Sequence, residues 1–135
     1  MRDCLNERCQ ATFDVASIEF GENSFWVFQD IGYEIKCKLN NPVNELEDRL
    51  VHEGWNCSPF PEAMVKEILS DTAFRREMYQ LNNSTKSYWL YLDVDALRHG
   101  KKDDRMSAFQ YSTPHYLVAL YIPEDNVLYY LECSI

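Results

Sequence analysis

The sequence has few of the features that divide a chain into domains, anchor it in a membrane or send it to an oxidising compartment. Its 135 residues include four glycines and five prolines, so no Gly/Pro-rich linker separates two domains. No apolar run approaches the ~18 residues of a transmembrane helix, and residues 1–9 lack the apolar stretch of a secretory signal. The odd count of five cysteines fits reduced thiols. These absences predict a single cytoplasmic domain over residues 1–135.

Basic residues are also scarce, because 13 Lys and Arg face 22 Asp and Glu and the formal charge is −9. Affinity for nucleic acid rests mainly on Lys and Arg that neutralise phosphates, so this balance speaks against a nucleic-acid or membrane partner. A negative field attracts a basic protein and speeds the encounter with it. Solubility alone is the simpler explanation of the charge.

Alternating apolar and polar residues predict strands at both ends of the chain, most clearly at 33–39. Further strands are expected at 12–20, 25–31, 87–95, 116–122 and 127–133. The turn from Pro123 to Asn126 joins the last two as a hairpin.

Helical periodicity is expected between these strands, at 44–54 and 61–82. Asn44 is the predicted N-cap of the first helix, and Gly54 is placed to end it. Ser70 and Asp71 could cap a fresh helix, so the second region is one long stretch or two helices with a bend. The order predicts an α+β fold, with an antiparallel or mixed sheet and two or three helices inserted between the N-terminal and C-terminal strands.

No motif identifies a chemistry. Cys4, Cys9, His52 and Cys57 could be drawn into a zinc site, but they lack the close spacing and turn residues of zinc knuckles. The histidines His52, His99 and His115 sit in no recognisable nucleophile context, and neither a G-x-S-x-G elbow nor a Gly-rich phosphate loop is present. We therefore expect a protein that is not an enzyme, without a cofactor or metal.

One alternative is enzymatic. Asp30 in one strand, followed after a turn at Gly32 by Glu34 and Lys36 in the next, resembles the Asp…Glu-x-Lys pattern of restriction-type nucleases. There the two carboxylates bind Mg²⁺ and the lysine assists the attacking water. The same letters also describe the outward face of an ordinary strand.

The strand at 87–95 carries the residues that we expect to bind a partner. One face has Tyr88, Leu90, Leu92 and Val94, which can fill a core; the other carries aromatic rings beside carboxylates, namely Trp89, Tyr91, Asp93 and Asp95. Such a face suits a protein interface, where Trp and Tyr supply binding energy and charge supplies steering. Alternatively, helices cover it and the two aromatics belong to the core. The paired acids Glu124 and Asp125, in the hairpin turn, complete the predicted partner-binding set.

In overall character the chain resembles the immunity proteins of bacterial toxin–immunity systems, including those of contact-dependent growth inhibition. The shared traits are small size, acidity, abundant Trp and Tyr, and no catalytic motif; no specific motif carries the resemblance, so no residue roles are transferred. It implies an antitoxin-like inhibitor that binds a cognate basic toxin domain, often a nuclease, and masks its active site or substrate path. Inhibitors of anti-phage defence have the same character and are the other alternative.

Overall fold

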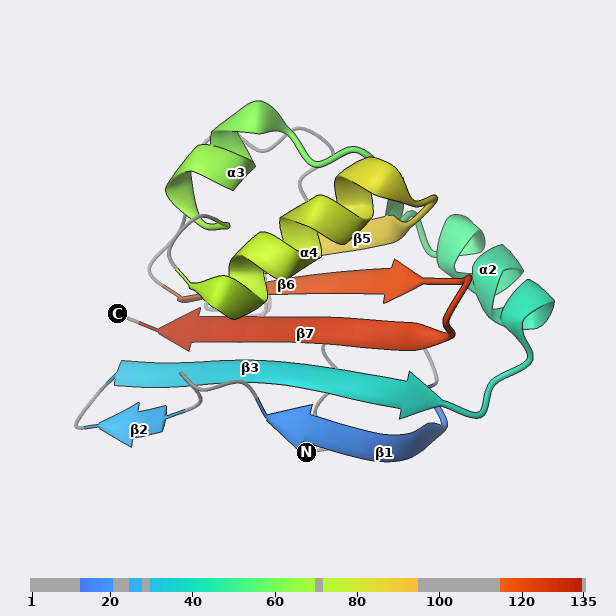
Figure 1. Ribbon diagram of the computed structural model, residues 1–135, viewed down its shortest axis with the longest axis horizontal. Coiled ribbons are helices and arrows are strands. Elements are labelled where there is room, and N and C mark those ends of the chain that lie inside the picture. Colours follow the sequence, from blue (N-terminus) through green and yellow to red (C-terminus); the bar gives the residue numbers. More distant parts are fainter. Residues whose placement is uncertain (1–12, 21–24, 28–29, 70–71, 95–114, 135) are drawn as a thin grey trace.

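The computed structural model describes residues 13–20, 25–27, 30–69, 72–94 and 115–134 (Figure 1). Their strands and helices follow the predicted order, with strands first, helices next and strands last. The strands are β1 (Val15–Phe20), β2 (Phe25–Val27), β3 (Asp30–Leu39), β4 (Asn56–Cys57), β5 (Tyr88–Asp93), β6 (His115–Ile122) and β7 (Val127–Ser134). The helices are α2 (Val43–His52), α3 (Glu62–Glu67) and α4 (Ala73–Ser84).

All seven described strands belong to one antiparallel sheet, in the order β1-β3-β7-β6-β5-β4, with β2 paired to the start of β3. The long β3–β7 pairing, from Ile31↔Ser134 to Lys38↔Val127, joins the N-terminal strands to the C-terminal ones. The predicted α+β fold is confirmed, and its sheet is antiparallel.

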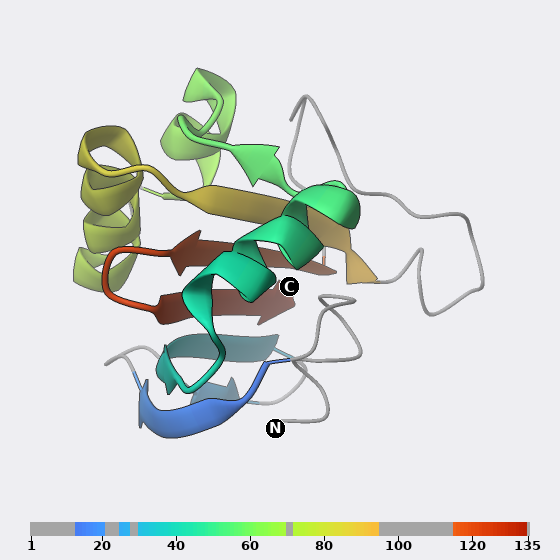
Figure 2. The ribbon, with the colours of Figure 1, turned by 90° about the vertical axis from the view of Figure 1, so that its right-hand side faces the viewer.

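Helices cover both faces of this sheet. α3 and α4 lie over one face, with α4 above β6 (Figure 1), and α2 lies apart from them (Figure 2). Leu46 and Leu50 of α2 pack on one face, and Met64 and Met78 of α3 and α4 pack on the other. All eight residues of β6 are therefore buried, which is the pattern of a strand covered on both sides.

The local sequence explains where the helices begin and end, with two corrections. Pro42, and not Asn44, is the N-cap of α2, and no side chain caps that helix. Gly54 follows α2 with φ of 87°, a left-handed conformation that favours glycine, and so terminates it as expected. Of the open possibilities for 61–82, two helices are found. Thr72, and not Ser70 or Asp71, is the N-cap of the second, and its side chain accepts a hydrogen bond from the Arg75 backbone N–H. In the described ranges, no helix is both long and apolar enough to cross a membrane.

The expected break at Gly32 is wrong. β3 runs without interruption from Asp30 to Leu39, and Gly32 pairs with Phe25 on one side and with Cys133 on the other. The connection from β2 to β3 falls at residues 28–29, outside the described residues. Gly32 is therefore an interior residue of a continuous strand and not a turn residue.

Candidate functional site

Trp89 and Tyr91 do not lie on a surface. Trp89 is 2% exposed and Tyr91 is 0% exposed, because α3 and α4 cover their face of β5. The Trp89 indole N–H donates to the Cys57 carbonyl at 3.1 Å, and the Tyr91 ring stacks on Tyr116. The prediction that these two rings contact a partner is therefore wrong, and of the two open interpretations the core one holds.

The predicted carboxylates have three different outcomes. Asp93 is half-buried on the face of β5 that α3 and α4 cover, and Asp95 lies outside the described residues. Glu124 and Asp125 are exposed in the β6–β7 turn, as expected for a hairpin. Among the described carboxylates of the predicted set, this last pair is the one exposed in the way that the sequence indicated.

Asn126 connects the turn that contains Glu124 and Asp125 to the end of β3 and to Asn41 through side-chain hydrogen bonds. Its side-chain N–H groups donate to the carbonyls of Leu39 and Asn41, each at 3.0 Å, and its amide oxygen accepts from the Tyr121 hydroxyl at 2.6 Å. Its φ of 52° is in the left-handed region, which asparagine tolerates better than most residues. The hairpin turn, the end of β3 and the approach to α2 are thereby fixed to one another.

Further carboxylates lie near the place where Asn41 and Asn126 are hydrogen-bonded to each other. The Asp14 backbone N–H donates to the Asn41 side chain at 2.7 Å, and Glu45 stands in the first turn of α2, just after Asn41. We call the four exposed acids Asp14, Glu45, Glu124 and Asp125 the acidic end. The carboxylates of Glu45, Glu124 and Asp125 make no hydrogen bond or ion pair with any residue in the described ranges. They remain available to an external cation.

Glu47 of α2 and Glu53, the residue that follows the helix, are already engaged. Glu47 accepts from the Tyr88 hydroxyl at 2.9 Å and lies 3.5 Å from the Lys86 ammonium, and Glu53 lies 3.7 Å from Arg49. Burial and the charge of Glu47 together raise the pKa of Tyr121 to about 12, so this phenol stays protonated while it donates to Asn126. α2 therefore contributes Glu45 to the acidic end, uses Glu47 in internal contacts and leaves Asp48 exposed.

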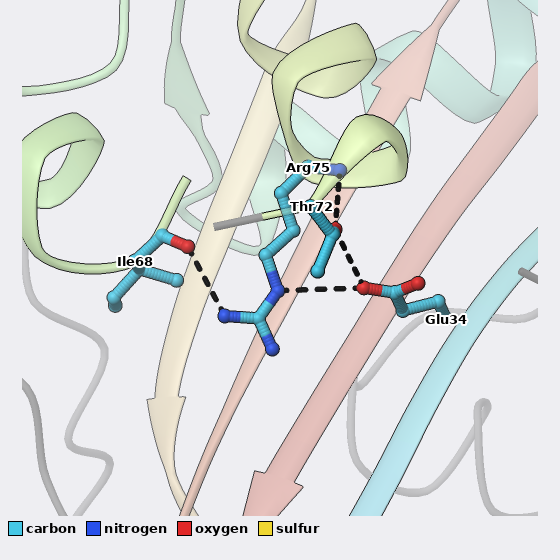
Figure 3. A network of polar contacts seen from close by, with 4 residues as sticks. All are labelled: Glu34, Ile68, Thr72 and Arg75. Atoms are coloured by element: carbon cyan, nitrogen blue, oxygen red, sulfur yellow. Dashed lines mark hydrogen bonds and ion pairs between the residues drawn. The ribbon is translucent and has the colours of Figure 1, made fainter. Parts of the chain in front are cut away.

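A different polar group lies inside the protein, where α4 begins over β3. Glu34 is buried, and its carboxylate accepts from the Thr72 hydroxyl at 2.8 Å and lies 3.4 Å from the Arg75 guanidinium (Figure 3). Arg75 also donates to the carbonyl of Ile68, at the end of α3, at 3.1 Å (Figure 3). We call Glu34, Thr72 and Arg75 the Arg75 cluster. It fixes α4 and the end of α3 to β3, which is a structural role.

Tyr116 extends this polar interior across the sheet. Burial raises the pKa of its phenol, a shift that the positive charge of Arg75 partly offsets and that Cys133 reinforces. Its ring stacks on Tyr91 with the centroids 5.9 Å apart. The sheet face below α4 is therefore packed with aromatic rings.

The opposite face of the sheet carries a second buried group. The His115 Nε2 atom is 2.8 Å from a Glu132 carboxylate oxygen, with the two side chains 4% and 5% exposed, and the Tyr130 hydroxyl donates to the other oxygen. A histidine oriented by a carboxylate also occurs in catalytic sites. Here the pair lies inside the sheet and joins the start of β6 to the end of β7.

The arrangement expected for a nuclease is not formed. Asp30 and Glu34 are four positions apart on one strand, which separates their backbones by about 13 Å, far more than two ligands of one Mg²⁺ allow. Glu34 is directed to Arg75 and Thr72, and the Lys36 ammonium lies over the Tyr129 ring, 5.6 Å from its centroid. The nuclease hypothesis thus loses the geometry on which it rested.

The zinc ligands drawn from the sequence are only partly described. Cys4 and Cys9 lie outside the described residues, as does His99, and His52 and Cys57 are exposed. Within the described ranges, no three His, Cys, Asp or Glu side chains are grouped as a metal site would require.

Comparisons of the chain with protein-family models, with curated protein sequences and with solved structures find no match. No relative therefore carries a function over to it, and the acidic end is the surface that the described residues offer as a candidate site. Asp14 was missed because only the folded chain brings it to Asn41, 27 residues away. Glu45 lies in the segment 44–54 where a helix was expected, but its position beside the hairpin could not be derived from that segment alone.

Proposed function

We propose that the chain is a cytoplasmic inhibitor of a basic protein, in the manner of an immunity protein that neutralises a cognate toxin domain, and that the acidic end meets this partner. The observation that carries the proposal is the grouping of four exposed carboxylates around the Asn41–Asn126 junction. A formal charge of −9 strengthens the attraction of the whole chain for a basic surface.

The attachment of the acidic end supports this role. Its carboxylates stand on a hairpin turn, on a helix and on the residue before β1, and hydrogen bonds fix these segments to one another, so little backbone order has to be gained on binding. Carboxylates held on a fixed backbone can mimic the phosphates that a basic nuclease binds. It would therefore occupy the substrate path of such a partner.

Capture from the native host tests the proposal. The tagged chain and a tagged Glu124→Lys/Asp125→Lys variant serve as baits, and bound proteins are identified by mass spectrometry. We expect the unaltered chain to enrich a basic protein whose activity it inhibits after purification, and the variant to lose it. A matched Glu62→Lys/Glu67→Lys variant makes the same change of charge on α3, where both residues are exposed, and should retain the partner.

The opposite outcomes would count against the proposal. If the chain and the acidic-end variant enrich the same protein equally, the acidic end is not the contact. If the protein that depends on Glu124 and Asp125 is itself acidic, the partner class is wrong. Equal thermal unfolding of the three baits excludes misfolding as the cause of a lost partner.

A further inference from the structure

β1 forms one edge of the sheet among the described strands. It pairs with β3 from Val15↔Leu39 to Phe20↔Ile35, and no described strand lies on its other side. The side chains at 16–19 are all exposed. An edge of this kind presents backbone N–H and C=O groups that an additional strand can pair with. The opposite edge is the two-residue strand β4, which is too short for the same use.

Side chains that are neighbours across β7, β3 and β1 form rows, and the last residue of each row, on β1, indicates which type of side chain would fit beside it. On the α4 face, Tyr129, Lys36 and Glu19 are successive cross-strand neighbours, and the Lys36 ammonium already contacts the Tyr129 ring. The next position outward therefore lies beside the exposed carboxylate of Glu19. Directly opposed side chains of opposite charge stabilise a strand pair, so this position favours lysine or arginine.

On the α2 face, the corresponding row runs from Leu128 through Cys37 to Ile18. Ile18 is 37% exposed, and it is one of few large apolar side chains among the described residues that face solvent. An apolar residue placed beside it would remove this surface from water. The two rows together favour a strand in which basic and apolar residues alternate.

We propose that β1 takes up an extended segment of the basic partner as an additional strand of the sheet, with a basic residue opposite Glu19 and an apolar residue opposite Ile18. This deepens the proposed function and rests on it, because Asp14 of the acidic end directly precedes β1. A strand on β1 would therefore continue into the acidic end. Backbone hydrogen bonds would also slow dissociation, which exposed charge alone does little to achieve.

A second copy of the chain suits this edge less well than a basic segment. It would bring a further charge of −9 to the same place, whereas the residues flanking and ending the edge include Asp14 and Glu19. Charge complementarity thus favours a basic occupant.

Peptide binding to the full chain tests the proposal without the natural partner. The probe is a capped peptide of alternating lysine and valine, about seven residues long to match an ordinary strand. Binding is followed through the backbone amide signals in NMR spectra. We expect the amide signals of Ser17, Ile18 and Glu19 to shift, and the outward-facing amides among them, which occur at alternate residues, to become protected from hydrogen exchange. A peptide with its lysine replaced by glutamate should bind at least about tenfold more weakly.

Two controls separate strand pairing from charge attraction. The lysine–valine peptide with alternate backbone amides N-methylated keeps its charge but cannot pair along one edge, and we expect at least about tenfold weaker binding. Glu19→Lys should weaken binding of the unmodified peptide about fivefold, and Glu67→Lys, the same charge change on α3, should leave it unaltered.

Each other outcome overturns the proposal. It fails if the unmodified peptide does not bind, if the methylated peptide binds equally well, or if the shifted amides lie outside β1. It also fails if the β1 amides shift when the protein alone is concentrated, because a second copy would then be the occupant. These results leave the proposed inhibition intact, since that depends on Glu124 and Asp125. Conversely, a peptide that binds β1 would not rescue the inhibitor proposal if capture fails.

Discussion

The acidic end and the Arg75 cluster use the same residue types for opposite purposes. At the Arg75 cluster, Glu34 is buried with a hydroxyl and a guanidinium as partners, and it connects three elements. At the acidic end, Glu124 and Asp125 are exposed, and the structural connections are made by the neutral side chain of Asn126. A buried carboxylate needs its partners, whereas an exposed one can be changed at small cost. The contrast separates acids that maintain the fold from acids that can bind.

The largest expected effect is at the Arg75 cluster. Arg75→Ala leaves the Glu34 carboxylate buried without its guanidinium and should lower the free energy of unfolding by about 3 kcal/mol. Urea unfolding followed by circular dichroism measures this change. The paired variant Glu34→Leu/Arg75→Met removes both charges together and should recover most of the loss. A loss below about 1 kcal/mol in Arg75→Ala would show that the cluster does not stabilise the fold as described.

A smaller loss of stability is expected when Asn126, whose hydrogen bonds support the acidic end, is replaced. Asn126→Ala removes three side-chain hydrogen bonds and places alanine, which tolerates the left-handed φ of 52° less well than asparagine does, and together these changes should cost about 2 kcal/mol. Asn126→Gly tolerates this φ and removes the same bonds, so the difference between the two variants isolates the backbone contribution. Equal stability of Asn126→Ala and the unaltered chain would mean that Asn126 does not fix the hairpin.

The sequence was sufficient for the fold class because its periodic signals are local. The alternation in β3 and the hairpin at Pro123 to Asn126 both appear where expected. The sequence was misleading for the exposure of Trp89 and Tyr91. The alternation in β5 predicts one buried and one exposed face, whereas both faces are buried. The nearly continuous apolar run of β6 was the available sign that helices cover both faces.

The candidate site was predictable only in part, because sequence patterns report local structure and some of its residues meet only in the folded chain. Glu124 and Asp125 belong to a turn, and a turn can be identified from its own residues. Asp14 and Glu45 reach the same place through hydrogen bonds to Asn41 and through the path of α2, contacts between segments far apart in the chain. The ion pair of Glu34 with Arg75 is likewise set by the packing of α4 on β3, which no local pattern contains.

The smallest effect on stability, and the most direct test of the central claim, is expected when Glu124 and Asp125 are both changed to lysine. Because both side chains are exposed, the free energy of unfolding should change by less than about 0.5 kcal/mol. The decisive measurement is the association rate constant with the captured basic partner at low and at high salt. We predict a rate at least about tenfold lower than that of the unaltered chain at low salt, with the difference disappearing at high salt. An unaltered association rate in a folded variant would contradict the account.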